Sequence, residues 1–414
     1  MQLLKMLLNT YSRKEEYMQS SNIVQPQQKN TIMQLLEKYK LDSRNNKMSL
    51  TAGIYMDETG ESPILDTVKV AERFLVKSQT CKAAFNMTGD VDFHRAVKKV
   101  VFPYFTEVEK KEICVIQTLG ASGAINLIGQ LVNQYAPLSR IWVSNPTWEN
   151  HEPLLGHHLG GICHYKYVAE NNKASASKIM EDLQYSKPGD YVLFHASCHN
   201  PTGIDPDLYQ WTELAEFCKD MRLIPIFDFA YQGFAYDLEK DTEVFGIFKQ
   251  NVDDFIVCNS FSKNMGLYDE RVGALSFIFT DQEKTNSWLQ TTKRLIRSSY
   301  SIPPIHGGAV ASHIINNDLL FKQWGEEVSG MRKDLERRRS DFFSTLDCVG
   351  MKEDILDFDK QNGMFVCLKL TEEEIGTLRE KYGIYMLDSG RISIASLNSK
   401  KIPLLCEAIK KLRV

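Results

Sequence analysis

Short apolar segments alternate with longer amphipathic segments through the middle of the chain, from about residue 113 to residue 280. Six of the apolar segments have the length of a strand and are rich in β-branched or aromatic residues: ICVIQTL, RIWVSN, YVLFHAS, LIPIFDFA, DFIVCNS and ALSFIF. Nearly continuous apolar runs of this kind are typical of parallel strands that helices cover on both faces. The pattern therefore predicts an α/β fold with a mostly parallel sheet, whose functional residues gather at the carboxyl ends of the strands.

Segments of helical period follow the strands and fill the last part of the chain. In GASGAINLIGQLVNQY, directly after the first run, one helical face carries the small or apolar residues Ala124, Ile125, Ile128, Leu131 and Val132. Residues 304–346 are mostly helical in pattern, and we expect their charged run KDLERRRSD to face solvent. The stretch LREKYGIYMLDSGRISIASL, followed by IPLLCEAIKKLRV, predicts helix, strand, strand and helix, a compact α+β unit.

Length and composition limit the classes of protein to consider. A chain of 414 residues is long enough for two domains around one site, and 43% apolar with 25% charged residues is ordinary for a globular protein. A net charge of −4 gives no indication of a nucleic-acid or membrane surface, so we expect small-molecule partners. Nine cysteines without CxxC pairs favour a reducing, cytoplasmic compartment, and no apolar run approaches the ~20 residues of a membrane-spanning helix.

The segment DDFIVCNSFSKNMGLYDERVG carries the strongest chemical signal. It ends a buried strand in a polar turn, with Lys263 in the turn and Arg271 eight residues later. A lysine held between an apolar strand and small hydroxyl residues can lose solvation, which favours the neutral amine and its attack on an aldehyde. On spacing alone, an exposed turn lysine is the alternative.

The wider motif, S-x-S-K followed by N-x-G-L-Y-x-E-R-x-G, resembles the cofactor-lysine signature of class I pyridoxal-phosphate-dependent aminotransferases. The resemblance covers nearly the whole chain from about Ile32 and is closest to bacterial aromatic amino-acid aminotransferases and their aspartate aminotransferase relatives. It implies fold type I: a large cofactor-binding domain (63–320) with a seven-stranded sheet, and a smaller α+β domain from residues 26–62 and 321–414. Residues 1–25 would form a poorly ordered arm. It further implies that Lys263 holds pyridoxal 5′-phosphate as a Schiff base in a homodimer with shared active sites, without a metal.

The resemblance assigns residues around the cofactor ring. Asp228 would face the pyridine nitrogen and keep it protonated, although an aspartate after a strand also suits a helix N-cap. Tyr231, in AYQGF, and Asn200, in SCHNPTG, would bond the phenolate oxygen. Trp148, in SNPTWENH, would stack on the ring, and His151 would support Asp228. Lys263, Asp228 and Tyr231 are thus the expected catalytic residues.

For the phosphate, the resemblance implies the turn formed by Gly120, Ala121 and Ser122, together with Ser260 and Arg271. Amides at a helix N-terminus favour an anion, and arginine adds a permanent bidentate charge. Without the resemblance, the small residues of GASGA would be explained as well by close packing of a helix on a strand.

For the substrate, Arg391, in DSGRISIAS, would hold the α-carboxylate, with the amide of Gly53 and the side chains of Trp148 and Asn200 nearby. Arg297, in LIRSSYSIPP, would reach across the dimer to the distal carboxylate of aspartate or glutamate. Taken singly, each arginine would more often be a surface residue.

One position departs from the family pattern. Ala84, in KAAFNMTG, stands where relatives have a tyrosine that reaches the cofactor phosphate of the neighbouring subunit. The missing hydroxyl should weaken cofactor retention by one charged hydrogen bond, roughly 1.5–3 kcal/mol.

The activity implied is ping-pong transfer of amino groups from aromatic or dicarboxylic amino acids to 2-oxoglutarate. A β-lyase or decarboxylase on the same fold is the main alternative, because a fold alone does not determine the reaction. A binding or regulatory protein that has lost turnover is a third hypothesis, which Ala84 makes conceivable.

Overall fold

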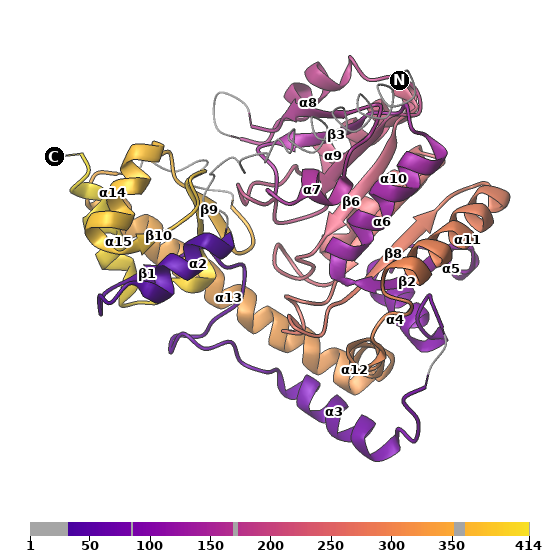
Figure 1. Ribbon diagram of the computed structural model, residues 1–414, viewed down its shortest axis with the longest axis horizontal. Helices are drawn as coiled ribbons and strands as arrows, with labels where there is room; N and C mark the ends of the chain where they lie inside the picture. The colour runs from indigo at the N-terminus through magenta and orange to yellow at the C-terminus, as the bar shows by residue number, and fades with distance from the viewer. Residues whose placement is uncertain (1–31, 84–85, 169–172, 352–360, 414) are drawn as a thin grey trace, which may run out of the picture.

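The computed structural model describes residues 32–83, 86–168, 173–351 and 361–413. Figure 1 shows a large part built around one twisted sheet and a smaller part beside it, connected by the long helix α13 (Asp318–Cys348). In the smaller part α2 (Ile32–Leu41), from the start of the described chain, lies close to elements from its end. The expected arm 1–25 and Ala84 lie outside the described residues.

The large sheet has seven strands in the order β2-β8-β7-β6-β5-β3-β4. The pairs formed by β3 with β4, β3 with β5, β5 with β6 and β6 with β7 are parallel, which confirms the predicted α/β fold with its mostly parallel seven-stranded sheet. In chain order the strands are β2 (Cys114–Leu119), β3 (Ile141–Asn145), β4 (Ile162–Lys166), β5 (Tyr191–His195), β6 (Ile224–Phe229), β7 (Phe255–Ser260) and β8 (Val272–Ile278).

Two strands differ from the expectation. The run ALSFIF was grouped with the parallel strands, but β8 pairs antiparallel with both β7 and β2. Residues 261–271 alone join β7 to β8, and a loop of this length is too short for the crossover that a parallel strand needs. The edge strand β4, with the sequence ICHYK, was not predicted, because its polar, half-exposed residues do not form an apolar run.

Helices cover both faces of the sheet, and neighbouring residues of a strand pack on opposite sides. Leu193 and Ile226 belong to the core beneath α6 (Gly120–Tyr135) and α11 (Gln282–Ser299). Phe194 and Phe227 belong to the other core, where they contact Trp211 of α9 (Leu208–Met221) and Phe248 of α10 (Glu243–Asn251). The apolar face predicted for α6 is buried as expected.

The region predicted to be mostly helical forms α12 (Ile305–Asn316) and α13. The expectation that the charged run of α13 faces solvent is wrong in part, because Arg338 and Arg339 are buried. Arg338 donates through Nη1 to the carbonyls of Ala395 and Leu397, at 3.2 and 2.9 Å. These bonds tie α13 to the C-terminal segment. The remaining helices are α3 (Asp66–Ser78), α4 (Val91–Val101), α5 (Glu107–Glu112), α7 (His151–Leu155) and α8 (Ala176–Leu183).

The C-terminal segment has the predicted order of elements: α14 (Glu372–Tyr382), β10 (Ile384–Tyr385), β11 (Arg391–Ser393) and α15 (Lys401–Lys410). Its strands belong to two separate small sheets. β10 pairs parallel with β1 (Met48–Ser49), whereas β11 pairs antiparallel with β9 (Phe365–Cys367). Leu50 joins the two sheets, because its N–H donates to the carbonyl of Tyr385 and its carbonyl accepts from Ser393. This pairing brings the segment around Gly53 towards the start of β11.

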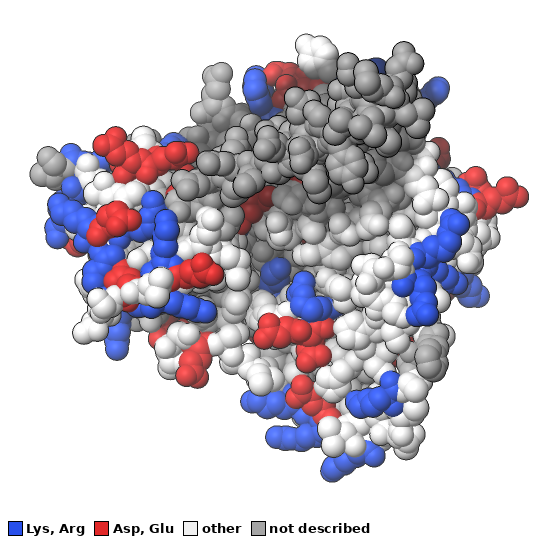
Figure 2. Space-filling view, viewed as in Figure 1, with Lys and Arg blue, Asp and Glu red and all other residues white. Residues whose placement is uncertain are grey.

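Charged side chains of both signs are mixed on part of the surface. On the left part of the face in Figure 2, around α14 and α15, Lys and Arg side chains are interspersed with Asp and Glu. All nine cysteines are free thiols. Among the described helices, none combines the length and the apolar character needed to cross a membrane.

Candidate active site

The loops after three adjacent parallel strands carry the predicted catalytic residues. β5 leads to Asn200, β6 contains Asp228 and leads to Tyr231, and β7 leads to Lys263. Because the strands are parallel, these positions meet at one edge of the sheet. The ammonium nitrogen of Lys263 lies 5.0 Å from the centroid of the Tyr231 ring. Burial lowers the pKa of the Lys263 amine to about 8, although the nearby Asp228 carboxylate acts in the opposite direction.

Asp228 lies inside β6, so the alternative of a helix N-cap is excluded. It alternates with Phe227 and Phe229, whose side chains point to the opposite face of the sheet. Its Oδ2 lies 3.2 Å from Nε2 of the fully buried His151, whereas its Oδ1 is buried with no partner among the described residues. Burial has the largest single effect and raises the pKa of this carboxyl, but the hydrogen bond from His151 and the nearby cationic groups together lower it below its usual value. The site thus holds a carboxylate with one unused acceptor.

Two further residues, which the sequence did not single out, extend this arrangement. His151 Nδ1 lies 2.7 Å from Thr147 Oγ1, which lies 3.4 Å from Nε2 of His195. The backbone N–H of Asn200 donates to Nδ1 of His195, at 3.0 Å. Burial lowers the pKa of His195 to about 3, so its ring is neutral.

The neutral ring determines one donor. His195 accepts at Nδ1 from Asn200 and therefore carries its proton on Nε2, which faces the hydroxyl of Thr147. Thr147 and His151 thus link the Asn200 loop to Asp228. The histidine that ends the run YVLFHAS was the available signal for it.

A second group of residues surrounds the N-terminus of α6. Its first turn contains Gly120, Ala121 and Ser122, and the preceding Leu119 provides no side-chain cap. The N–H of Gly120 donates to the carbonyl of Arg271, so Gly120 supplies space rather than a donor. A Cβ at Gly120, where φ is +67°, would lie 2.9 Å from Nη2 of Arg271. The amides of Ala121 and Ser122 lie in the turn that has no acceptor within the helix.

The loop after β7 supplies the other side of this cradle. Nη1 of Arg271 donates to the carbonyl of Tyr268 at 2.9 Å and to Oγ of Ser262 at 3.3 Å. The N–H of Ser262 donates to Oγ of Ser260, at 3.1 Å. Ser262 belongs to the quoted S-x-S-K motif, but the sequence did not assign it a role. The uncapped helix turn, the guanidinium and the hydroxyls together suit an anion.

Arg391 is buried at the other end of the site. Its Nη1 donates to Oδ1 of Asn200 at 3.1 Å, and its Nη2 donates to the carbonyl of Thr51 at 2.7 Å. Its guanidinium lies 4.3 Å from the Phe365 ring centroid, and its Nε is buried with no partner among the described residues. Burial lowers the pKa of Arg391, and Glu149 nearby opposes that effect. This is a rigid cation with a free donor, as a carboxylate ligand requires.

The structure brings two more predicted residues to this region. A Cβ at Gly53 would lie 2.8 Å from Cζ of Phe365 and 3.5 Å from the hydroxyl of Tyr231, so only glycine lets the backbone approach so closely. The ring of Trp148 packs edge-on against His151, with centroids 5.4 Å apart.

Arg297 is not buried in the site within one chain. It is exposed near the end of α11, where its Nη1 donates to Oγ of Ser301. α11 packs against α6 on one face of the sheet, and the part of α11 that contacts the core ends at Ile296. Within one chain, Arg297 therefore lies apart from the other predicted site residues.

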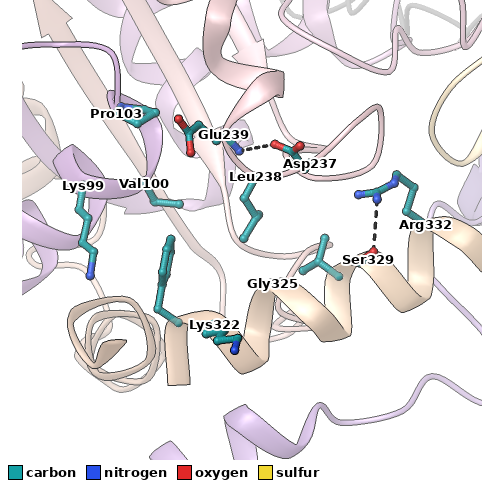
Figure 3. Close-up of a pocket in the computed structure, with 12 residues that line it drawn as sticks. Lys99, Val100, Pro103, Asp237, Leu238, Glu239, Lys322, Gly325, Ser329 and Arg332 are labelled. Atoms are coloured by element: carbon teal, nitrogen blue, oxygen red, sulfur yellow. Dashed lines mark hydrogen bonds between the residues drawn. The ribbon is translucent and has the colours of Figure 1, made fainter. Parts of the chain in front are cut away.

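A cavity of about 390 Å³ lies elsewhere, between α4, residues 237–239 and α13 (Figure 3). Its lining combines Val100, Leu238 and Val328 with charged side chains from all three segments. None of the predicted site residues lines it, so size alone does not identify the active site.

Comparison with known proteins provides independent evidence. The family model for aminotransferases of class I and II matches residues 45–409. The aspartate aminotransferase of Salmonella typhi is 38% identical over 380 residues, which cover 91% of this chain and 96% of that protein. The aromatic-amino-acid aminotransferase of Pseudomonas aeruginosa is 34% identical over 379 residues, covering 91% and 95%. An aromatic-amino-acid aminotransferase of Burkholderia pseudomallei, solved covalently bound to pyridoxal phosphate, has a TM-score of 0.86 at 32% identity, with 92% and 96% of the two chains covered.

Proposed function

Since the chain belongs to the family of class I and II aminotransferases, we propose that it moves amino groups from aspartate and aromatic amino acids to 2-oxoglutarate, with pyridoxal phosphate bound at Lys263. The observation that carries the proposal is the desolvated Lys263 amine close to the half-satisfied carboxylate of Asp228. The alternative of a β-lyase or decarboxylase is not favoured, because the matching relatives are named as aminotransferases. The same matches disfavour a protein without turnover.

The residues of the site fit this cofactor. The unpartnered Oδ1 of Asp228 is an acceptor for the protonated ring nitrogen, and Trp148 would lie on the ring. Ala121, Ser122, Ser260 and Arg271 would hold the phosphate at the uncapped end of α6. Tyr231 and Asn200 would bond the phenolate oxygen. When bound, pyridoxal phosphate supplies an aldehyde that joins amino groups and a ring that accepts the electron pair of the substrate α-carbon.

The chain's own residues perform the remaining tasks. The pKa of Lys263 is lowered to about 8, so a fraction of its amine is neutral near neutral pH. The neutral amine can take the proton from the substrate α-carbon and give it to the carbon of the cofactor that carries the nitrogen. Asp228 keeps a proton on the ring nitrogen, and His151 orients that carboxylate. Arg391 binds the α-carboxylate through its free donor, while Asn200 and Thr51 hold the guanidinium in place.

For the side-chain pocket, we assign Arg297 of a second copy to the distal carboxylate of dicarboxylic substrates. This assignment requires a homodimer with shared active sites, and the exposure of Arg297 within one chain supports it. Aromatic side chains would occupy the same pocket by apolar contact.

The division into domains is a further part of the proposal. Residues 26–62 and 321–414 would form the small domain and residues 63–320 the large one. The pairing of β1 with β10 and the hydrogen bond from Arg391 to Thr51 support this division, since each joins residues from the two ends of the chain. A reducing compartment, the cytoplasm, agrees with the free thiols.

Labelling with borohydride tests the cofactor assignment. Purified protein incubated with pyridoxal phosphate should take up the cofactor and, after reduction, carry it on the peptide that contains Lys263. Lys284→Ala, which alters a lysine paired with Asp254 elsewhere, should label as the parent does. The proposal is wrong if the reduced holoprotein leaves Lys263 unlabelled. Holoprotein that has not been reduced should yield glutamate from aspartate and 2-oxoglutarate, without release of ammonia or carbon dioxide.

A further inference from the structure

Asp241 is a buried acid that takes no part in the chemistry described above. It lies in the short 3₁₀ turn Lys240–Thr242 before α10, and only 4% of it is exposed. Its carboxylate accepts three backbone N–H groups: Gly233 at 2.8 Å, Ala235 at 3.1 Å and Tyr236 at 2.8 Å. Because the carboxylate accepts hydrogen bonds from three amides of one short segment, it fixes the path of that backbone.

The backbone that Asp241 holds continues from a turn that begins at Tyr231. The N–H of Phe234 donates to the carbonyl of Tyr231 at 3.1 Å, so residues 231–234 form a turn. Gly233, with φ +90°, lies inside the turn and is also held by Asp241. The carboxylate therefore holds the far side of the turn whose first residue supplies the hydroxyl in the active site.

Cavities lie on both sides of the segment that follows this turn. Asp237, Leu238 and Glu239 line the cavity of about 390 Å³ in Figure 3, where Leu238 points into the space between the loop and α13. Ala235, Tyr236 and Asp241 line a second cavity of about 400 Å³. Atoms that face a cavity lack contacts on that side, so the position of the loop depends more on its hydrogen bonds.

Asp205 occupies a matching place beside the other loop. It accepts the N–H groups of Cys198 and His199, both at 2.9 Å, and Nδ2 of Asn362 at 3.1 Å. Cys198 has φ +54°, a left-handed conformation that a residue with a side chain adopts only when its surroundings hold it. These two amides immediately precede Asn200. Asp205 lines the second cavity together with Asp241.

We propose that Asp241 and Asp205 are positioning residues: Asp241 sets the position of Tyr231, and Asp205 sets that of Asn200. The inference rests on the proposed function, because it concerns the two groups assigned to the phenolate oxygen of the cofactor. Those groups stabilise the phenolate and thereby lower the pKa of the nitrogen that joins Lys263 to the cofactor. Loosening either loop should raise that pKa.

The first test is an absorbance titration of the holoprotein against pH. In Asp241→Asn, an N–H₂ group replaces one acceptor and opposes the loop amides, and the titration should move upward by roughly 0.5–1 pH unit. Asp207→Asn is the matched control: Asp207 lines the same cavity but caps α9 and contacts neither loop. The control should lose thermal stability and keep the titration of the parent.

A double-mutant cycle separates positioning from general destabilisation. If Asp241 acts through Tyr231, adding Asp241→Asn to Tyr231→Phe should shift the titration no further, whereas adding Asp205→Asn should still shift it. An unchanged titration in Asp241→Asn, or an equal shift in the Tyr231→Phe background, would overturn the proposal.

Hydrogen exchange of the protein without cofactor provides a readout that does not depend on activity. In Asp241→Asn, the amides of residues 233–236 should exchange faster and those of residues 198–199 should not change. In Asp205→Asn, the amides of residues 198–199 should exchange faster and those of residues 233–236 should not change. Exchange that rises equally over the whole molecule would contradict the inference. If Asp241→Asn does not fold, the titration of Asp205→Asn and the hydrogen exchange of residues 198–199 in that variant test the proposal. Failure of the parent protein to take up pyridoxal phosphate would instead refute the proposed function, and this inference with it.

Discussion

The two substrate arginines lie in contrasting environments. Arg391 is buried, and hydrogen bonds from two of its nitrogens to Asn200 and Thr51 hold it against the ring of Phe365. Arg297 is exposed on α11, and its bond to Ser301 is the one hydrogen bond that the described residues give its side chain. Residues of one chain thus surround Arg391, whereas Arg297 is left open to solvent.

The difference shows how much of a site a single fold can specify. A buried charge needs partners within the chain, because an unpaired ion in the interior is costly. His151 therefore orients Asp228, and Asn200 and Thr51 hold Arg391. An exposed arginine carries no such requirement and acquires its role only from the group that comes to face it. Substitutions at the inner end should therefore have large effects on all substrates, and those at the outer end smaller and selective effects.

The largest effect is expected for Asp228→Asn. The neutral amide cannot keep a proton on the ring nitrogen, and His151 would lose its charged partner. Loss of one preorganised interaction that stabilises charge in the transition state lowers turnover by roughly 10²–10³-fold. Turnover with aspartate and with phenylalanine should fall equally, as steady-state kinetics would show.

A control for this substitution is Asp190→Asn. Asp190 is also buried, but it pairs with Arg140 and Trp142 near the start of β5, away from the site. It should lower the melting temperature and leave turnover within a few fold. If Asp228→Asn kept the turnover of this control, the assignment of the ring-nitrogen partner would have to be abandoned.

The sequence was sufficient for the inner end because its signals are local. Lys263 and Arg271 share one loop, and Asp228 ends one apolar run, so a linear motif describes them. The contribution of His195 depends on the parallel pairing of β5 with β6, which places it beside Asp228 and which no single segment encodes. The histidine in YVLFHAS is visible in the sequence, but its link through Thr147 to His151 and Asp228 is not.

Other differences have physical causes of the same kind. The direction of β8 follows from the length of the loop before it rather than from its composition. Arg338 was expected in solvent, because a charged run on a helix normally lies there; it is buried because carbonyls of the C-terminal segment, almost 60 residues later, accept its hydrogens. Helix, strand and core positions could be predicted from periodicity, whereas these long-range partners could not.

A smaller but still general effect is expected for Arg391→Lys. Lysine retains the charge but cannot hold Asn200 and Thr51 while also donating to a substrate carboxylate, which the planar guanidinium can. Loss of one charged hydrogen bond corresponds to about 10–10²-fold in kcat/KM, mainly through KM. All amino-acid substrates should be affected alike, and selective loss for aspartate would show that Arg391 faces the distal group instead.

Arg297→Ala examines the outer end. If Arg297 of a second copy binds the distal carboxylate, kcat/KM for aspartate should fall about tenfold or more, while that for phenylalanine should change by less than about threefold. Arg294→Ala is the control: Arg294 lies one turn earlier on α11 and bonds Thr291. Equal losses for the two substrates would refute the pocket assignment, and a protein that is monomeric in sedimentation while fully active would refute the shared site.

The smallest expected effect is on the folding stability of the protein, through Lys263 at the inner end of the site. Burial lowers the pKa of Lys263 to about 8 in the folded protein without cofactor, below the value near 10.5 of a free lysine. The unfolded chain therefore binds more protons between these two pH values, so the contribution of Lys263 to stability rises with pH across that window. Below about pH 8 both states are protonated, and the folded state bears the full cost of the buried charge.

Lys263→Met removes that cost and retains the length of the side chain. The cofactor-free variant should exceed its parent in free energy of unfolding by about 1–2 kcal/mol at pH 7, a value discounted because Lys263 is only partly buried. The pH-dependent part of this gain should disappear by about pH 10.5, where the parent lysine is neutral in both states. Urea unfolding at pH 7 and pH 10.5 measures the difference, in which the titration of all other lysines cancels.

Lys284→Met, which loses the ion pair with Asp254, should show no gain at pH 7. A gain in Lys263→Met that is the same at both pH values would mean that apolar packing, rather than relief of a buried charge, stabilises the variant, and Lys263 would then lack the desolvation that makes it a base.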